Sequence, residues 1–526
     1  MKKITLFSTA LLLGIFAFIV FYYNFFVGLR PAIISPKSDI AEIIEKSDIA
    51  AQNNTDFPLA LPKNFSISIF AKDLGKPRVI AWGPTGEFLA SLIDSGKVIA
   101  LKDSNGDGYA ETSWTVADGL NKPHGIAVRC RDKCELYIAE ENQLSVFDWD
   151  SENRRAINKR KVTDFPTGGN HATRTIMFRP YPYEDELLIS IGSSCNVCIE
   201  SDPLRASIQV FNVKTNESRI FATGLRNSVF MSAHPVSGEV WATEMGRDWL
   251  GNDLPPDEIN IIKDSVGPST SSGRNSIPNF GWPICYGKNI HDSEYDKNIY
   301  VRDPCADKEP SLFDIPAHSA PLGLAFFPEE GWPEEYWYDL LVAYHGSWNS
   351  TEPVGYKLVR YDLDAEGKLL GVSDFISGWL QDDGSSLGRP VDILIQPAGT
   401  IYVSDDKAGV IYKIQRETDK SNLIRVFDIE QYSKIESPLI VSGEARGYWF
   451  FEASFPVRVI DSDEKELGVG IAQAKSEWMT QDFVPFEVTI EFVKPETEIG
   501  WIVLEKDNPS GLPENADELR VPVRFR

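Results

Sequence analysis

An internal repeat between about residues 57 and 417 constrains the fold more than any other feature of the sequence. Six segments share one plan: a short apolar strand, a turn that often holds Pro or Gly, a second strand, a polar loop and a third strand. The segments begin near Arg78, Pro123, Ala172, Leu225, Pro321 and Arg389. Each unit spans about 60 residues, which suits a four-stranded blade with loop insertions. The repeat predicts an all-β, six-bladed β-propeller over residues 57–417.

The composition changes after about residue 419, where the blade plan is not repeated. Residues 422–526 contain alternating strands such as FPVRVID, FEVTIEF and WIVLEK. Short strands with this alternation are typical of a half-buried sheet. The sequence predicts a separate β-sandwich of about 100 residues at this end.

The N-terminus predicts export from the cytoplasm. Lys2 and Lys3 precede residues 4–29, which carry no charge. A helix of that length spans roughly 39 Å, enough to cross a bilayer with some tilt. No A-x-A cleavage site follows, so we expect an uncleaved transmembrane helix over residues 1–29, with the bulk of the chain facing the periplasm or the extracellular side. A cleaved signal segment is the alternative. Residues 30–56 are polar and predict a linker.

The cysteines agree with that compartment, and the net charge bears on the partners. Six cysteines fall in close pairs, Cys130 with Cys134, Cys195 with Cys198 and Cys285 with Cys305. An even number of cysteines outside the cytoplasm predicts three local disulfides. The net charge of −25 repels phosphate backbones, so we expect no nucleic-acid partner.

Polar residues recur at two positions of the repeat. In an antiparallel hairpin the start of the first strand and the end of the second lie at the same edge, so these residues should converge on one face of the propeller. The first-strand starts carry His124, His171 with Arg174, Arg226 with Asn227, His318 and Arg389. The second-strand ends carry Glu140 and residues 192–194, 244–248, 345–349 and 405–407. This ring holds four of the six histidines and predicts a ligand pocket at the channel mouth. Its arginines could bind an anion or cap strand ends.

Two segments invite a metal-binding interpretation. Residues 103–108, DSNGDG, resemble the first half of a calcium loop, but Trp114 stands where a bidentate carboxylate is needed. We therefore predict an Asx-rich turn there. The loop at residues 243–260 is rich in carboxylates and could hold calcium, or could be a solvated acidic loop.

Nine motifs together resemble the sorbosone dehydrogenase branch of the pyrroloquinoline-quinone (PQQ) dependent glucose/sorbosone dehydrogenases. They are GGNHATRTIMF, GSSCNVC, GLRNSVF, GRDWLGNDLPPDEIN, FGWPICYG, HSAPLGLAF, HGSWN, GRPVDILI and YVSDDKAG, in the order expected for that family. The resemblance implies a six-bladed propeller that binds PQQ and Ca²⁺ over its channel. It also implies a quinoprotein oxidoreductase acting on a sugar or a sugar-derived aldehyde, with an unspecified electron acceptor.

The resemblance also implies roles for individual residues. His171 matches the histidine that acts as general base. Arg226 and Asn227 match cofactor contacts, and Arg389 matches an arginine near the quinone carboxylates. Gly246 and Arg247 match the positions whose carbonyls ligate calcium.

One position departs from the family. The soluble glucose dehydrogenases place a lysine on the fifth blade against the cofactor, whereas this chain reads AYHGSWN. We expect His345 to substitute, with Lys357 or Lys407 reaching in.

The tail resembles the immunoglobulin-like domain of bacterial spore germination and envelope proteins, through SPLIVSGEARGYWFFEASFPVRVID and FVPFEVTIEF. That resemblance implies contact with the cell envelope or with a partner. Two other functions remain open for the whole chain. A calcium-dependent propeller lactonase would need carboxylates around the channel, where this ring is rich in His and Arg. A non-catalytic, envelope-associated binding module would need no base.

Overall fold

The computed structural model describes residues 50–525 except 106, 265–276, 417–419, 422, 430–432, 462–464, 496, 498 and 510–516. The predicted membrane segment at residues 1–29 and most of the predicted linker lie outside the described residues. Within the described part, no helix is both long and apolar enough to cross a bilayer.

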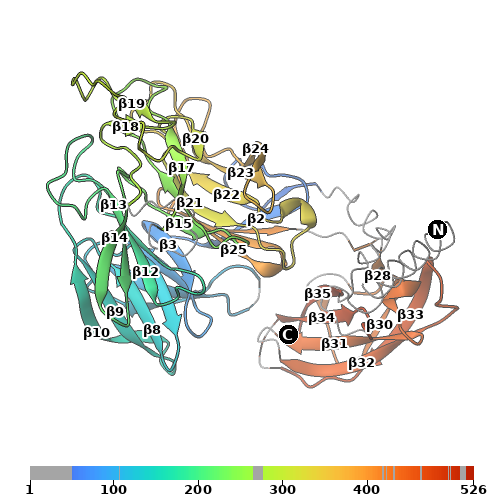
Figure 1. The fold of residues 1–526 in the computed structure, drawn as a ribbon. Helices are drawn as coiled ribbons and strands as arrows, with labels where there is room; N and C mark the ends of the chain where they lie inside the picture. The colour runs from blue at the N-terminus through green and yellow to red at the C-terminus, as the bar shows by residue number, and fades with distance from the viewer. Residues whose placement is uncertain are drawn as a thin grey trace, which may run out of the picture.

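Five four-stranded antiparallel sheets and one five-stranded sheet are arranged around a central axis (Figure 1). The first three blades are β3 (Pro77–Trp82), β4 (Phe88–Leu92), β5 (Lys97–Lys102) and β6 (Thr112–Ala117); β7 (Ile126–Cys130), β8 (Cys134–Ala139), β9 (Gln143–Asp150) and β10 (Arg155–Asp164); and β11 (Arg174–Phe178), β12 (Glu186–Ile191), β13 (Ser207–Asn212) and β14 (Glu217–Thr223). The predicted six-bladed propeller is confirmed.

The remaining blades follow the same order from the axis outward. They are β15 (Met231–Ala233), β16 (Val240–Glu244), β17 (Asp257–Ile262) and β20 (Phe313–Ile315); β21 (Pro321–Phe326), β22 (Leu340–Tyr344), β23 (Lys357–Leu363) and β24 (Leu369–Ile376); and β25 (Pro390–Gln396), β26 (Thr400–Asp405), β27 (Val410–Arg416) and β2 (Phe65–Ala71), with β1 (Gln52–Asn53) parallel to β2. Single 3-10 turns, Glu334–Tyr336 and Pro397–Gly399, lie within the last two blades.

The last blade is completed by the N-terminal end of the propeller. Strand β2 precedes the first blade in sequence but pairs antiparallel with β27, with Phe65 opposite Arg416. Its buried residues Phe65 and Ile67 join the same core cluster as Tyr412 and Ile414. Since this pairing hydrogen-bonds the first segment to the last, the ring closes without an open sheet edge between its ends.

The innermost strands β3, β7, β11, β15, β21 and β25 pack side by side around the channel. Two glycines permit the close approach. A Cβ on Gly125 would lie 2.7 Å from the carbonyl oxygen of Arg174 in the next blade, and one on Gly323 would lie 2.6 Å from that of Val391. The amide of Gly125 donates to the Arg174 carbonyl at 2.8 Å, so neighbouring blades are hydrogen-bonded at the mouth.

All three predicted disulfides are present. Cys130–Cys134 joins β7 to β8 across their turn, and Cys195–Cys198 closes the loop after β12. Cys285–Cys305 closes the long insertion of the fourth blade, which also contains the small hairpin β18 (Cys285–Tyr286) and β19 (Ile290–His291).

The C-terminal region forms a second body with its own core, which includes Trp449, Phe455 and Phe486 (Figure 1). Its eight strands are hydrogen-bonded in the order β28-β30-β33-β32-β31-β34-β35-β29. The strands are β28 (Ile424–Val426), β29 (Ser433–Lys434), β30 (Leu439–Arg446), β31 (Ser454–Asp461), β32 (Glu466–Ala474), β33 (Phe483–Ile490), β34 (Ile499–Glu505) and β35 (Glu518–Arg524), with a 3-10 turn at Gly447–Trp449. The predicted sandwich is thus one continuous sheet, because β31 pairs with both β32 and β34.

Candidate active site

His171 lies in the loop before β11, and its ring is held from one side. Its Nδ1 lies 2.9 Å from the carbonyl oxygen of Ser193 and 3.0 Å from the Ser193 hydroxyl. Because a carbonyl only accepts, the proton sits on Nδ1 and the lone pair on Nε2. Burial, reinforced by the charge of Arg226, lowers the pKa of His171 to about 3. The imidazole is therefore neutral at physiological pH and can accept a proton at Nε2.

Two buried arginines fix the backbone that carries His171. Arg174 donates to the carbonyl of His171 at 2.9 Å and to that of Pro166 at 2.9 Å. Arg205 donates to the carbonyls of Thr167 and Gly168 at 2.9 and 2.6 Å. These cation-to-carbonyl bonds hold the loop rigidly, since charge-assisted hydrogen bonds are the strong ones.

The side chain of Arg226 is hydrogen-bonded to two neighbouring loops. Its N–H groups donate to the carbonyl and side-chain oxygens of Asn196, both at 2.9 Å, to the carbonyls of Met245 and Gly246 at 3.4 and 2.9 Å, and to the Asp248 carboxylate at 3.0 Å. These five bonds use all five donors of the guanidinium. Arg226 therefore ties the Cys195–Cys198 loop to the loop that carries the predicted calcium ligands.

Asn227 lies beside His171 because residue 192 is a glycine. A Cβ at Gly192 would lie 2.5 Å from the Asn227 Oδ1 and 2.8 Å from the His171 Cβ. The backbone N–H of Asn227 donates to the Glu244 carboxylate at 2.9 Å. The structure thus brings together His171, Arg226 and Asn227, as the sequence predicted.

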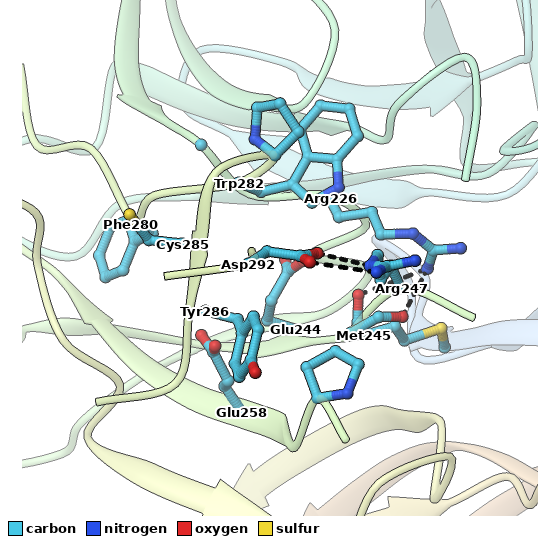
Figure 2. Close-up of a pocket in the computed structure, with 14 residues that line it drawn as sticks. Arg226, Glu244, Met245, Arg247, Glu258, Phe280, Trp282, Cys285, Tyr286 and Asp292 are labelled. Carbon is cyan, nitrogen blue, oxygen red and sulfur yellow. Dashed lines mark hydrogen bonds and ion pairs between the residues drawn. The ribbon is translucent and has the colours of Figure 1, made fainter. Parts of the chain in front are cut away.

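The loop after β16 carries Gly246 and Arg247 beside a small pocket (Figure 2). The Gly246 amide donates to Asp257 at 2.8 Å. Arg247 pairs with Asp292 of the insertion, with contacts of 2.5 and 3.1 Å that Figure 2 marks. The backbone amide of Gly246 and the side chain of Arg247 therefore orient the loop, while the carbonyls of both residues remain the predicted metal ligands.

Carboxylates line the same pocket and are buried. Burial raises the pKa of Glu258 to about 7 and holds that of Glu244, directly opposite it across β16 and β17, well above its ordinary value. One Glu244 oxygen, Oε2, has no hydrogen-bond partner among the described residues. The acidic loop predicted at residues 243–260 is thus partly inside the fold, with oxygen atoms suited to a hard cation.

A second cluster lies where the first, fifth and sixth blades meet. His345 Nε2 lies 2.9 Å from one oxygen of Asp406, and Arg78 donates to the other at 2.6 Å. Burial lowers the pKa of His345 to about 4 in spite of the carboxylate. Burial raises the pKa of Asp406, but the hydrogen bond from His345 and the charge of Arg78 outweigh it and hold the pKa below the ordinary value.

Arg389 belongs to this cluster through backbone acceptors. Its guanidinium donates to the carbonyl of His345 at 3.0 Å and to that of Gly346, and lies 5.6 Å from the centre of the Tyr356 ring. Nη1 of Arg389 has no hydrogen bond to a described residue, so it is available to an anion.

Two lysines expected near the cofactor have protein partners in the structure. The exposed Lys407 donates to Ser386 at 2.7 Å, and Lys357 pairs with Asp374 at 2.6 Å. Sequence reasoning missed Asp406 as the partner of His345, although it precedes Lys407 in YVSDDKAG. Its neighbour Asp405 accepts from the backbone amides of Arg389 and Lys407 and is structural.

The other two histidines of the predicted ring differ in their surroundings. His124 is fully buried, with Nδ1 3.2 Å from the Thr175 hydroxyl and Nε2 without a partner in the described part of the chain. Burial holds its pKa well below the ordinary value. His318 Nε2 lies 2.8 Å from the carbonyl oxygen of Gly251 and fixes a loop.

Residues 103–111 combine the predicted turn with a carboxylate group. The amide of Asp107 donates to the Asn105 side chain at 3.0 Å, as in an Asx turn. Carboxylate oxygens of Asp103, Asp107 and Glu111 also lie within 4.8 Å of one another, close enough to share a cation. Glu111 was missed because the calcium-loop pattern was tested only at its twelfth position.

Residues 59–417 match the family described as TrAA12-like. The chain belongs to the TrAA12-like family. Residues 423–511 match the immunoglobulin-like domain of bacterial spore germination. Both resemblances seen in the sequence motifs, one for the propeller and one for the tail, are therefore confirmed.

Three relatives illustrate the range of this TrAA12-like protein's similarity. An uncharacterized protein of Borreliella burgdorferi is 32% identical over 387 residues, covering 71% of this chain and 95% of its own length. A PQQ-dependent pyranose dehydrogenase of Coprinopsis cinerea is 23% identical over 68% of this chain, and the match spans about half (55%) of that enzyme. A PQQ-dependent sugar dehydrogenase of Hypocrea jecorina is 22% identical, covering 67% of this chain and 88% of its own length.

Solved structures agree on the propeller fold. A calcium structure of a Trichoderma reesei enzyme of carbohydrate-active family AA12 superposes with a TM-score of 0.58 at 21% identity, covering 70% of this chain and 100% of its own. The holo form of the PQQ domain of the Coprinopsis cinerea pyranose dehydrogenase gives 0.57 at 21% identity with the same coverage.

Proposed function

We propose that this TrAA12-like protein is a quinoprotein oxidoreductase that oxidises a sugar or a sugar-derived aldehyde with PQQ and Ca²⁺. The observation that carries the proposal is the neutral His171, whose Nδ1 is fixed by Ser193 while Nε2 has no protein partner among the described residues. The names of the Coprinopsis and Hypocrea relatives support the reaction class.

The polar groups near the mouth fit an anionic, carbonyl-rich cofactor. Several buried polar atoms lack a partner within the described residues: Nε of Arg78, Nε2 of His124 and both amide atoms of Asn349. Buried polar groups are normally paired, so these are candidates for contacts with a bound group. PQQ carries three carboxylates, and Nη1 of Arg389, which has no hydrogen bond within the described residues, offers a donor to one of them.

Calcium fits the loop after β16. It prefers carbonyl and carboxylate oxygens. The Gly246 carbonyl already accepts from Arg226, but a carbonyl has a second lone pair, and the Arg247 carbonyl is adjacent. When bound, PQQ would supply the hydride acceptor and Ca²⁺ would polarise its carbonyl.

The chain's own residues would do three things in this reaction. His171 Nε2 would take the proton from the substrate hydroxyl, or from the hydrate of an aldehyde. Ser193 would keep the imidazole in the required tautomer, and Arg174 would keep its backbone in place. Arg226 would act by holding the metal loop, since its donors already have protein acceptors.

We also infer a location outside the cytoplasm, with residues 1–29 as the membrane anchor and the immunoglobulin-like region as a contact to the cell envelope. The three disulfides support an oxidising compartment.

The test is reconstitution of the purified chain with PQQ and Ca²⁺, followed by dye reduction across aldoses and aldehydes. We expect turnover that requires PQQ and falls when Ca²⁺ is chelated before PQQ is added. Protein that binds no PQQ and reduces no dye with any of these substrates would contradict the proposal and favour a binding module.

A further inference from the structure

Two tryptophans are exposed at the channel mouth. Trp249 is 69% and Trp348 is 65% exposed, and their rings meet edge to face with centroids 5.4 Å apart and planes at 89°. A single exposed aromatic residue is ordinary, but a pair held in contact is an apolar patch on a polar surface.

The loops that carry the two tryptophans hold each other in place. Trp249 and Trp348 belong to the loops after β16 and β22, and these loops are hydrogen-bonded to each other. Asn252 donates to the Thr351 hydroxyl at 2.5 Å and accepts from the Thr351 amide at 3.2 Å. Trp249 also has φ of 69°, a conformation that bulky residues rarely adopt. Such positions persist where the surrounding structure enforces them, often at ligand sites.

Each tryptophan follows a residue that is linked to one of the two groups of the candidate site: the loops held by Arg226, and the cluster that contains Arg389. Trp249 follows Asp248, which pairs with Arg226 at 3.0 Å. Trp348 follows Ser347, whose carbonyl accepts from the Tyr356 hydroxyl, and the Tyr356 ring lies against Arg389. The contact between the two rings therefore links the loop held by Arg226 to the loop beside Arg389.

We propose that Trp249 and Trp348 form an outer subsite that holds a second sugar ring, so that the preferred substrate is an oligosaccharide. The proposal rests on the proposed function, because it extends the same mouth outward. A pyranose ring presents a face of C–H groups that packs on an aromatic face, and its hydroxyls remain in water. The loops that carry the pair also hold amide and hydroxyl side chains, Asn252 and Thr351, which suits a sugar better than a lipid.

The experiment measures saccharide binding by calorimetry on the full chain without PQQ. The ligands are glucose, maltotriose and cellotriose. The variants are the double variant Trp249→Ala with Trp348→Ala, the corresponding double Phe variant, and Phe427→Ala as a control. Phe427 is 58% exposed in the second body, so this control removes an exposed ring from elsewhere.

We expect at least one trisaccharide to bind wild-type protein about tenfold more tightly than glucose, a difference of about 1.4 kcal/mol. The double Ala variant should lose that difference, whereas the double Phe variant keeps most of it and Phe427→Ala keeps all of it. Circular dichroism checks folding; if the double Ala variant does not fold, the single Ala variants replace it, and each should lose part of the difference.

Dye reduction with PQQ and Ca²⁺ is measured in parallel, so the two proposals can fail separately. Trisaccharide binding no tighter than that of glucose, or unaffected by the tryptophan substitutions, overturns the subsite even if sugars are oxidised. Tryptophan-dependent trisaccharide binding without any sugar oxidation supports the subsite and overturns the dehydrogenase. A wild-type dimer that the double Ala variant abolishes overturns the subsite in favour of a contact between copies.

Discussion

His171 and His345 both lie at the channel mouth, but their hydrogen-bond partners differ. This difference indicates which of them can act as a base and which has a structural role. Within the described residues, the ring of His171 is hydrogen-bonded to Ser193 through Nδ1, and the neighbouring charges are arginines. The ring of His345 uses Nε2 to contact Asp406, and its carbonyl accepts from Arg389. Burial lowers both pKa values, to about 3 and about 4. Both side chains are neutral, but Nε2 of His345 has a carboxylate partner, whereas Nε2 of His171 has none among the described residues.

The largest expected effect is on catalysis at His171. The variant His171→Gln keeps the approximate size and a hydrogen bond to Ser193 but removes the base. We expect kcat to fall about 10²–10⁴-fold, the usual contribution of general-base catalysis, with little change in PQQ affinity. His345→Gln is the matched variant and should lose far less kcat. Equal losses in the two variants would show that the comparison is wrong.

The next effect is on stability at Asp406. Asp406→Ala leaves the buried Arg78 without its carboxylate, and breaking a buried pair in this way costs about 3–5 kcal/mol. We expect the free energy of unfolding in urea to fall by that order, while Asp382→Ala, an exposed control, changes it little. A decrease in unfolding free energy no larger than that of the Asp382 control would mean that Asp406 does not stabilise the second cluster.

The pH dependence of stability tests the buried, neutral state of His345. A histidine whose folded pKa lies below its unfolded value of about 6.5 binds fewer protons when folded, so its contribution is full above pH 6.5 and is lost as pH falls toward the folded pKa. For His345 this window runs from about pH 6.5 to about pH 4. At the lower end of the window the lost unfolding free energy reaches roughly 3 kcal/mol. His345→Gln should flatten the curve of unfolding free energy against pH in that window. An unchanged slope would contradict a buried, neutral His345.

The smallest expected effect concerns the disulfides. Replacing Cys195 and Cys198 by Ala opens a very short loop and should cost about 2 kcal/mol of stability. Replacing Cys285 and Cys305, which close a longer loop, should cost about 3 kcal/mol. Activity should show the reverse order, because the first loop carries Asn196, which holds Arg226. If loss of the Cys285–Cys305 disulfide lowers kcat more than loss of Cys195–Cys198, the insertion contributes more to the active site than the Cys195–Cys198 loop does.

The sequence alone determined the features that depend on local pattern. Blade number follows from the repeat, because each blade is built mainly from hairpins between neighbouring strands. The disulfides follow from short cysteine spacings. The convergence of His171, Arg226 and Asn227 follows from hairpin geometry, which puts strand starts and strand ends at one edge.

Only the tertiary structure decided the pairings between distant parts of the chain. Strand β2 completes the last blade, and Arg78 meets Asp406 across 328 positions, because closing the ring brings the first blade against the last. Lys407 turns to Ser386, although its place in the motif suggested the cofactor. The five bonds of Arg226 depend on loops from two blades. Such partners are fixed by how the blades pack, and packing between distant segments leaves no periodic signal in the sequence.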